Sequence, residues 1–379
     1  MGEEKEFEIK LVASTGNLVS PEDATRFAQS AGRICYSEKD WDELQEEKLS
    51  PGLTNHLRNC GHHSPFEHVH LTFYMKGIPK ALAMLLNNER PYVTSEKSAR
   101  YTVMKDIEPL QRELYDKWLA RFIELVERKV PEVTDPKHRQ KLAQENARYM
   151  TSVFTPTKML HTLSLRKLNE LIFELERVAP EYQESREPFK KRLAEAINGF
   201  LEQTRQWRVE GLNNRTERRL SFFRPHAKEY FGDVYSTFSA MSFACLAQAH
   251  RHRTIDYGIS GGLESDATPV FFVPPIIQDT PLSAEWQQDL ERIAESDIPQ
   301  GQLLSVSETG ALEDFRSKMI LRLCGHAQYE IMRNTLATAR KYAQQMPEVK
   351  EWARPKCQQG MKCNEPCVWR GEKALERII

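Results

Sequence analysis

The feature that most restricts the fold of this chain is a pattern that occurs twice. In the stretch VHLTFYM, the odd-numbered residues from Val69 to Met75 are apolar, which is the period of a half-buried strand, and an apolar helical segment follows at 79–89. The stretch STFSAMSFACLAQAHRHR, residues 236–253, is likewise typical of a strand end followed at once by an apolar helix. This repeated order predicts two diverged copies of one unit.

Other segments fit a helix-rich α+β fold with small antiparallel sheets. We expect a strand at 8–13 and a helix that has Pro21 at its first position. Residues 106–178 look helical almost throughout, with breaks at Pro131, Thr155-Pro156 and Pro180, and 312–346 looks like one long amphipathic helix. The prolines of TPVFFVPP predict a loop or an edge segment.

Length and composition limit the possible functions. A chain of 379 residues can hold two domains, and we place the first copy at 1–207 and the second, with a cysteine-containing tail, at 208–379. The 53 lysines and arginines nearly balance the 54 aspartates and glutamates, so the overall charge does not favour nucleic acid or a membrane surface as partner. With no signal segment, no membrane-length apolar run and seven cysteines that fit reduced thiols, we expect a soluble, cytoplasmic protein.

Positive charge is concentrated in AQAHRHR, at the end of the second apolar helix. On a helix, Gln248 and Arg251 would share a face, whereas Arg251 and Arg253 would point in different directions and serve two different groups. Cations at a helix C-terminus can also simply offset the helix dipole. The stretch therefore predicts either a local anion site or a charge-balanced helix end.

Two further stretches carry polar groups suited to a ligand. If SEKSARY is extended, Glu96, Ser98 and Arg100 project to one side, as they would around a nucleotide, and the alternative is an ordinary polar loop. In LRLCGHAQYEI, Arg322 and His326 would lie one turn apart on a helix. The glycine between them indicates close packing or a ligand against the backbone, and the alternative is a solvated arginine beside a satisfied histidine.

Two clusters contain residue types that can ligate metals. CGHHSPFEHVH, residues 60–70, has four histidines and one glutamate without a tight ligand spacing, which favours a packed polar cluster beside a ligand over a metal site. The tail PKCQQGMKCNEPC contains Cys357, Cys363 and Cys367 with loose spacing and no fourth ligand nearby in the sequence. A free or structural tail is favoured over zinc, and we expect no metal.

Taken together, these stretches resemble the flavin-dependent thymidylate synthase family. GHHSPFEH resembles the family's PFEH-type segment, AQAHRHR its Arg-His-Arg helix and SEKSARY its NExSxRY-type stretch. ENARY, around Arg148, resembles the family's Ala-Arg pair, and RLCGHAQYEI resembles its late helix. The match covers most of the chain and implies a thymidylate-synthase-complementing-type unit in each copy.

The two copies differ in the motifs that they keep. In the first copy, residues 88–90 read Asn-Glu-Arg where the family has Arg-His-Arg, and Leu175 stands where the late helix has an arginine. The second copy keeps Arg-His-Arg at 251–253 and also Arg322, but it lacks the SxRY stretch. In the family, a homotetramer, each site takes halves from two subunits. The resemblance therefore implies one complete site per two copies and a homodimer that forms a pseudo-tetramer.

The resemblance also implies a role for individual residues. Arg322 would be catalytic, at the uracil face, where it would stabilise charge that develops on the ring. Ala311 and Glu313 replace an Asn-x-Arg pair that the family uses for flavin, and Arg316 is a candidate substitute. The implied nucleotide ligands are Glu96, Ser98, Arg100, Arg148, Gln248 and Arg251. The implied flavin ligands are His62, Ser64, Glu96, Arg251, His252 and Arg253.

By this resemblance, the chain would convert dUMP to dTMP by reductive methylation. FAD would be the bound cofactor, with NAD(P)H and methylenetetrahydrofolate as co-substrates, and no protein nucleophile is required because reduced flavin supplies the hydride. One alternative keeps the flavin but changes the pyrimidine nucleotide or the product. Another is a catalytically silent nucleotide-binding protein, which loss of the Asn-x-Arg pair favours, whereas retention of Arg322 favours an enzyme.

Overall fold

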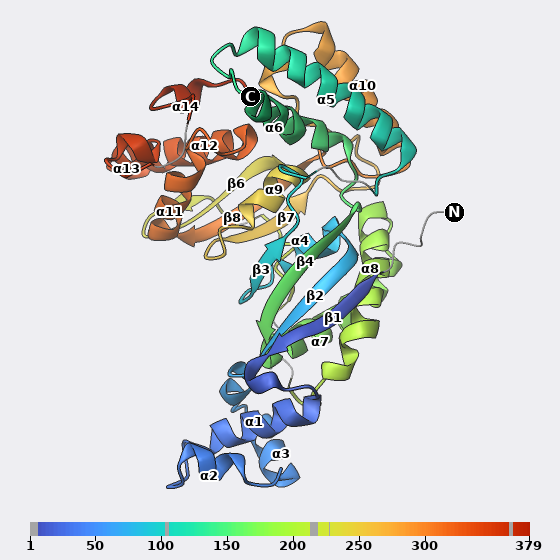
Figure 1. Cartoon of the computed structure of the whole chain (residues 1–379), viewed down its shortest axis with the longest axis vertical. Helices are drawn as coiled ribbons and strands as arrows, with labels where there is room; N and C mark the ends of the chain where they lie inside the picture. Colours follow the sequence, from blue (N-terminus) through green and yellow to red (C-terminus); the bar gives the residue numbers. More distant parts are fainter. Residues whose placement is uncertain (1–6, 103–105, 213–218, 227, 364–366) are drawn as a thin grey trace. The chain divides into compact units, whose positions relative to one another are not determined.

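The computed structural model describes residues 7–102, 106–212, 219–226, 228–363 and 367–379 (Figure 1). The chain packs as two compact units. Unit 1 consists of Met1–Lys97 and Pro156–Leu220, and unit 2 consists of Ser98–Thr155 and Ser221–Ile379. Each unit contains a four-stranded antiparallel sheet and several helices, which confirms the expected helix-rich α+β fold.

The sheet of unit 1 has the strand order β1-β2-β4-β3. The predicted alternation becomes the buried face of β2, where the side chains of Leu71, Phe73 and Met75 are at most 2% exposed. Helices α7 and α8 follow β4 and pack on this sheet (Figure 1). The strands are β1 (Glu8–Ser14), β2 (His70–Pro79), β3 (Val93–Glu96) and β4 (Pro156–Ser164); the helices are α4 (Lys80–Leu86), α7 (Leu165–Gln183) and α8 (Pro188–Thr204).

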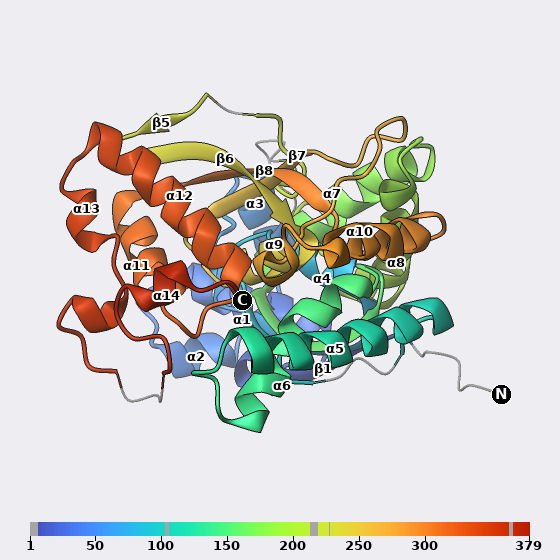
Figure 2. The same cartoon turned by 90° about the horizontal axis from the view of Figure 1, so that it is seen from above.

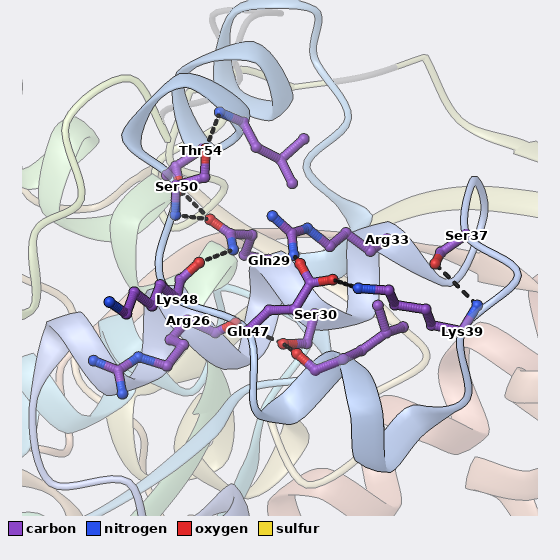
Figure 3. Close-up of polar contacts among 12 residues, drawn as sticks. Arg26, Gln29, Ser30, Arg33, Ser37, Lys39, Glu47, Lys48, Ser50 and Thr54 are labelled. Carbon is purple, nitrogen blue, oxygen red and sulfur yellow. Dashed lines mark hydrogen bonds and ion pairs between the residues drawn. The ribbon is translucent and has the colours of Figure 1, made fainter.

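Three helices between β1 and β2 are held together by polar contacts (Figure 3). Pro21 is the first residue of α1, as predicted. The side-chain oxygen of Gln29 accepts the backbone N–H of Ser50 at 2.7 Å, and the hydroxyl of Ser30 donates to the carbonyl of Leu44 at 3.0 Å. These bonds tie the buried face of α1 to the two helices after it. The helices are α1 (Pro21–Arg33), α2 (Trp41–Gln45) and α3 (Pro51–Asn59).

The sheet of unit 2 has the order β5-β6-β8-β7, which repeats the order of unit 1 position for position. In both units a short apolar helix connects two strands that are consecutive in the chain. Helix α4 connects β2 to β3 in unit 1, and α9 connects β6 to β7 in unit 2. The expected strand and helix of STFSAMSFACLAQA are therefore confirmed. The elements are β5 (Tyr230–Phe231), β6 (Val234–Ser242), α9 (Phe243–Ala249), β7 (Asp256–Gly261) and β8 (Leu303–Ala311).

An aromatic core lies among the other helices of unit 2. Helix α5 packs against α6 and α10 (Figure 2). The rings of Trp118 and Trp286 meet edge to face with their centroids 4.8 Å apart, and Tyr149 joins them from the 3-10 segment Arg148–Met150. The remaining helices are α5 (Pro109–Lys129), α6 (Pro136–Ala147), α10 (Pro281–Ala294), α11 (Leu312–Arg322), α12 (Tyr329–Gln345), α13 (Val349–Trp352) and α14 (Lys373–Glu376).

Three expectations about secondary structure are wrong. Residues 156–164 form β4 instead of a helix, because every second side chain from Thr157 to Leu163 is buried against the sheet and its helices. Helix α7 passes through Pro180, which lies in its last turn. The segment 312–346 is two helices, and the chain leaves the helical path at 323–328. The TPVFFVPP segment lies outside the named strands, as expected, with one isolated bridge.

Residues 98–155 pack in unit 2, although they precede position 207 in the chain. The compact units therefore do not coincide with the ranges 1–207 and 208–379. The ranges 1–207 and 208–379 describe a proposed duplication of the sequence and not the packing of the chain. This division stays a prediction. None of the described helices combines the length and apolar character needed to cross a membrane.

A buried ion pair joins α11 to the sheet of unit 2. Nζ of Lys318 lies 2.6 Å from Oε2 of Glu308, the two side chains are 1% and 2% exposed, and the hydroxyl of Tyr235 donates to the same carboxylate. Removing one member leaves the other charged and buried without its partner. Such losses cost about 3–5 kcal/mol.

We predict that Lys318→Met lowers the free energy of unfolding of unit 2 by about 3–5 kcal/mol, measured by urea unfolding. Lys341→Met is the matched control, because its partner Glu229 lies 2.8 Å away but both side chains are about one-third or more exposed. The control should cost about 0–1 kcal/mol. Equal losses in the two variants would contradict the assignment of a buried, stabilising pair.

Candidate functional site

Four separate segments of unit 2 converge on one polar cluster. The turn after β3 supplies Arg100, and the end of α6 with its 3-10 extension supplies Glu145 and Arg148. The end of α9 supplies Gln248, followed by the turn 251–253. The junction between α11 and α12 supplies Arg322, His326 and Gln328.

Arg100 is held in place by a buried carboxylate. Its Nε and Nη2 donate to Oε1 of Glu145 at 2.8 and 2.6 Å, and Nη2 also donates to the carbonyl of His326 at 2.9 Å. Glu145 is 4% exposed and precedes Arg148 by three residues, which places both near one face at the end of α6. The ion pair therefore fixes Arg100 beside a second arginine.

Gln248 connects the arginines to one another. Its amide is oriented by its partners: the oxygen accepts from Nη1 of Arg100 at 3.2 Å and from Nη1 of Arg322 at 3.1 Å. Its nitrogen donates to the side-chain oxygen of Gln328 at 3.0 Å. A single neutral amide thus holds together two cations that would otherwise repel each other.

Arg148 is buried with a donor that no described residue satisfies. Its Nη2 donates to the side-chain oxygen of Gln328, but its Nε has no hydrogen-bond partner. Burial lowers the pKa of Arg148, and the nearby positive charge of Arg100 lowers it further. A buried unsatisfied donor costs about 1–3 kcal/mol. This donor is suited to an anionic ligand, which would relieve both the missing hydrogen bond and the charge repulsion.

Arg322 is oriented by a neutral histidine. Its Nε donates to Nε2 of His252 at 2.6 Å. Burial, then Arg322 and Lys318, lower the pKa of His252 to about 2, so the imidazole accepts with its unprotonated nitrogen at neutral pH. Burial and the charges of Arg100 and Arg251 lower the pKa of Arg322 to about 10, which leaves it charged at pH 7.

The Arg-His-Arg turn presents one exposed cation. Arg251 lies beyond the end of α9, so the expectation that it shares a helix face with Gln248 is wrong. Its side chain is exposed and donates no hydrogen bond to any described residue, which fits the anionic diphosphate of a dinucleotide such as FAD. His252 does not fit as an anion ligand, because it is buried, neutral and occupied by Arg322. Arg253 is half-buried.

A second network anchors Gln328. Its Nε2 donates to the hydroxyl of Tyr149 at 2.6 Å, and that hydroxyl donates to Glu330 at 2.8 Å. Glu330 also accepts the backbone N–H and the hydroxyl of Ser242, at 2.7 and 2.6 Å, and burial raises the pKa of its carboxyl. The sequence analysis assigned no role to Gln328 and Glu330 in HAQYEI or to Glu145 in ENARY. Their positions next to motif residues could have indicated that they belong to the site.

Three of the expected site residues belong to unit 1. Glu96 ends β3 and accepts from Nζ of Lys80 at 2.6 Å and from the amide of Asn87 at 3.3 Å. Ser64 is exposed at the start of a 3-10 turn. The ring of His62 meets Tyr36 edge to face, with centroids 6.1 Å apart.

Two local expectations are wrong. SEKSARY is extended only to Glu96, because Ser98 opens a turn in which its carbonyl accepts the N–H of Tyr101 at 3.2 Å, so the three polar side chains do not line one strand. Arg322 is the last residue of α11 and His326 lies in the following junction, so they do not share a helix face. Their proximity to Arg100 comes from tertiary packing.

The chain has recognisable relatives among known proteins. Residues 11–198 match the family model described as thymidylate synthase complementing protein. The flavin-dependent thymidylate synthase of Clostridium tetani is 28% identical over 214 residues, which cover 45% of this chain and 83% of that protein. The flavin-dependent thymidylate synthase of Mycobacterium bovis (strain BCG / Pasteur 1173P2) is 30% identical over 115 residues, 28% of this chain and 45% of that protein. Thymidylate Synthase X from Helicobacter pylori, solved with FAD and dUMP, is 18% identical and covers 55% of this chain and 99% of its own, with a TM-score of 0.31 that is too low to bear on the fold.

The lowered pKa of His252 predicts a pH dependence of stability. Below about pH 6.5 the imidazole takes up a proton in the unfolded chain but not in the folded one, so stability falls as the pH decreases from 6.5 toward 2. The slope from this group reaches about 1.4 kcal/mol per pH unit. Urea unfolding between pH 5 and 7.5 should show this slope, and His252→Gln should remove it. His68→Gln, at an exposed position, is the control. An unchanged slope in His252→Gln would show that the buried imidazole is protonated.

Proposed function

Because this chain belongs to the flavin-dependent thymidylate synthase family and is a methyltransferase-type enzyme, we propose that it methylates dUMP to dTMP in the arginine cluster of unit 2. One observation carries the proposal. Arg100 and Arg322 donate to Gln248, and Arg148 and Arg251 lie within electrostatic reach of these two arginines. Glu145 is the one carboxylate that pairs with any of the four among the described residues. Arg148 is buried and Arg100 and Arg322 are half-buried, so this excess of positive charge is partly withdrawn from water and favours a bound anion, such as the phosphate of a nucleotide.

The arginines divide the work of binding the phosphate. Arg100 already uses four of its five N–H groups on Glu145, His326 and Gln248, so it mainly positions its neighbours. Arg148 has its unsatisfied Nε, and Arg251 has a guanidinium that donates to no described residue. We therefore assign Arg148 and Arg251 as the principal phosphate ligands. Ser98, on the turn that carries Arg100, is a further candidate ligand.

Arg322 acts on the pyrimidine ring. A methyl group is added at carbon 5, and negative charge accumulates on the uracil when that carbon becomes nucleophilic. Arg322 remains charged at neutral pH, and His252 and Gln248 restrict its side chain from two sides, so a fixed cation meets the developing charge. His252 is accordingly a positioning residue.

FAD would provide the redox chemistry. Bound flavin supplies the hydride that reduces the transferred one-carbon unit, with methylenetetrahydrofolate as the carbon donor and NAD(P)H as the reductant. By the resemblance, Arg251 holds the nucleotide and also lies near the flavin, so it would contact the phosphates of both, and Arg253 would hold those of the flavin. The resemblance also implies His62, Ser64 and Glu96, which belong to unit 1, as flavin ligands. The exposed Arg251 supports this assignment, since a cation without a protein partner suits a phosphate.

We further propose that the chain contains two diverged copies of one unit in tandem, which together form one complete active site. The equal strand order of the two sheets supports two copies of one unit. In the first copy, Leu175 stands at the position of the catalytic arginine and is fully buried in α7, so that helix serves as core. The surviving site takes Arg100 and Arg148 from the first copy and the other arginines from the second. Two chains would form the pseudo-tetramer.

Nucleotide binding provides the first test. Arg148→Met and Arg251→Ala should each weaken dUMP binding about 10- to 100-fold, because a hydrogen bond to a charged group contributes about 1.5–3 kcal/mol. Arg340→Ala, at an exposed position near the end of α12, is the control and should bind normally. Calorimetric titration of dUMP measures the affinities. Unchanged affinity in both site variants would place the phosphate elsewhere.

Turnover provides the second test. Methylation at carbon 5 releases the hydrogen of that carbon, so dUMP labelled there with tritium reports the reaction directly. Arg322→Lys keeps a positive charge but loses the fork that contacts both His252 and Gln248. We expect at least a 100-fold loss of tritium release with dUMP affinity changed less than 10-fold. An equal loss of dUMP affinity would show that Arg322 contributes to substrate binding and not specifically to the transition state.

A silent nucleotide-binding protein is the second candidate, and one observation favours it. Arg316, which could have replaced the missing flavin arginine, lies with its guanidinium 4.6 Å from the centroid of the Trp352 ring. It is thus already engaged, and Ala311 and Glu313 offer no substitute. Absorbance near 450 nm decides between the two: bound flavin that responds to dUMP supports the synthase, while colourless protein that cannot be reconstituted but binds dUMP supports the silent binder.

A further inference from the structure

Four cysteines of unit 2 face one cavity that the nucleotide site does not use. The cavity has a volume of about 220 Å³. Cys357, Cys363 and Cys367 come from the tail after α13, and Cys324 comes from the junction between α11 and α12. The sequence shows three tail thiols without a fourth partner nearby, and the fold corrects that expectation by bringing Cys324 to the same cavity.

A glycine makes this approach possible. A Cβ atom built on Gly325 would lie 2.7 Å from Sγ of Cys367 and 2.9 Å from the carbonyl oxygen of Trp369, closer than side chains tolerate. The close packing that the sequence indicated at this glycine is therefore present. It holds the tail directly against Cys324.

The cysteines are reduced and close enough to influence one another. None of the seven in the chain is in a disulfide. The thiol of Cys367 donates to the carbonyl of Trp369 at 3.2 Å, and Cys357 accepts the backbone N–H of Gly371 at 3.4 Å. All four line the same cavity.

We propose that Cys324, Cys357, Cys363 and Cys367 bind a thiophilic metal centre, either a Zn²⁺ ion or an iron–sulfur cluster. Four thiolates are the usual ligand set for both centres. A Zn²⁺ ion would offset half of the charge of four thiolates, and the two cations Lys356 and Arg370, which also line the cavity, would offset the other half. In the described part of the chain the thiols are not yet gathered at ligand distance, so binding requires them to rotate toward the cavity centre.

The site would stabilise the region around the arginine cluster. Cys324 follows Arg322 by two residues, and its neighbour His326 supplies the carbonyl that accepts from Arg100. A metal that links the tail to this junction would hold both groups in position. The proposal nevertheless stands apart from the nucleotide chemistry, because metal content is measured without substrate or flavin.

The test is metal analysis of the full-length chain, produced in medium with added zinc and iron and purified without oxygen. We expect about one zinc per chain, or iron together with acid-labile sulfide and an absorbance near 400 nm. The iron and sulfide assays distinguish a cluster from flavin, whose absorbance overlaps. Cys324→Ser and Cys363→Ser should each lower the metal content at least 10-fold, while Cys35→Ser, at an exposed cysteine of unit 1, should not.

Metal uptake by the unchanged chain tests the site even if a cysteine variant fails to fold. The unchanged chain, stripped with a chelator under reducing conditions and checked by circular dichroism, should take up Zn²⁺, or iron with sulfide, to the same stoichiometry. Absence of metal after purification and after both reconstitutions would overturn the proposal. Full metal content in Cys324→Ser would also overturn it, because the fourth ligand would then lie elsewhere. A disulfide among these cysteines, found by mass mapping of the oxygen-free sample, would do the same.

Discussion

Unit 2 is organised around the repulsion between buried guanidinium groups. Arg100, Arg148 and Arg322 lie within electrostatic reach of one another, and burial removes the water that would screen them. The fold compensates with one carboxylate, Glu145, and with neutral acceptors: the amides of Gln248 and Gln328, a backbone carbonyl and an unprotonated imidazole. Neutral acceptors orient the cations without cancelling them. The cluster therefore keeps a net positive charge that a bound anion can use.

In the tandem arrangement that we propose, the two copies need not be alike. A site built from two half-sets of motifs tolerates loss of each half in the copy that does not present it. Leu175 in α7, and Asn88 and Glu89 after α4, are buried, as expected of positions that contribute to packing instead of binding. Residues 98–155 belong by packing to unit 2, which would bring the two proposed half-sets into one compact body.

Sequence reasoning predicted the elements whose signal is local. The period of β2, the proline start of α1 and the strand followed by α9 each follow from a short pattern. The sequence-based predictions failed where tertiary packing overrides local preference. The sequence of β4 has a helical pattern, and the break between α11 and α12 lies where the tail packs against Gly325. The proposed site residues come from motifs and stay a prediction. Glu145, Gln328 and Cys324 were not assigned, because partners far apart in the chain leave no spacing that sequence analysis can use.

The path of the chain has a consequence for how this protein can be divided. Unit 1 is interrupted by 98–155, so the backbone passes from one unit to the other three times, at 97–98, 155–156 and 220–221. No single cut separates the units. A fragment that begins at 208 would lack α5 and α6, leave Trp286 without Trp118, and carry Arg322 without Arg100 or Arg148. The two halves of the chain are thus mutually dependent, because neither contains a complete core for unit 2.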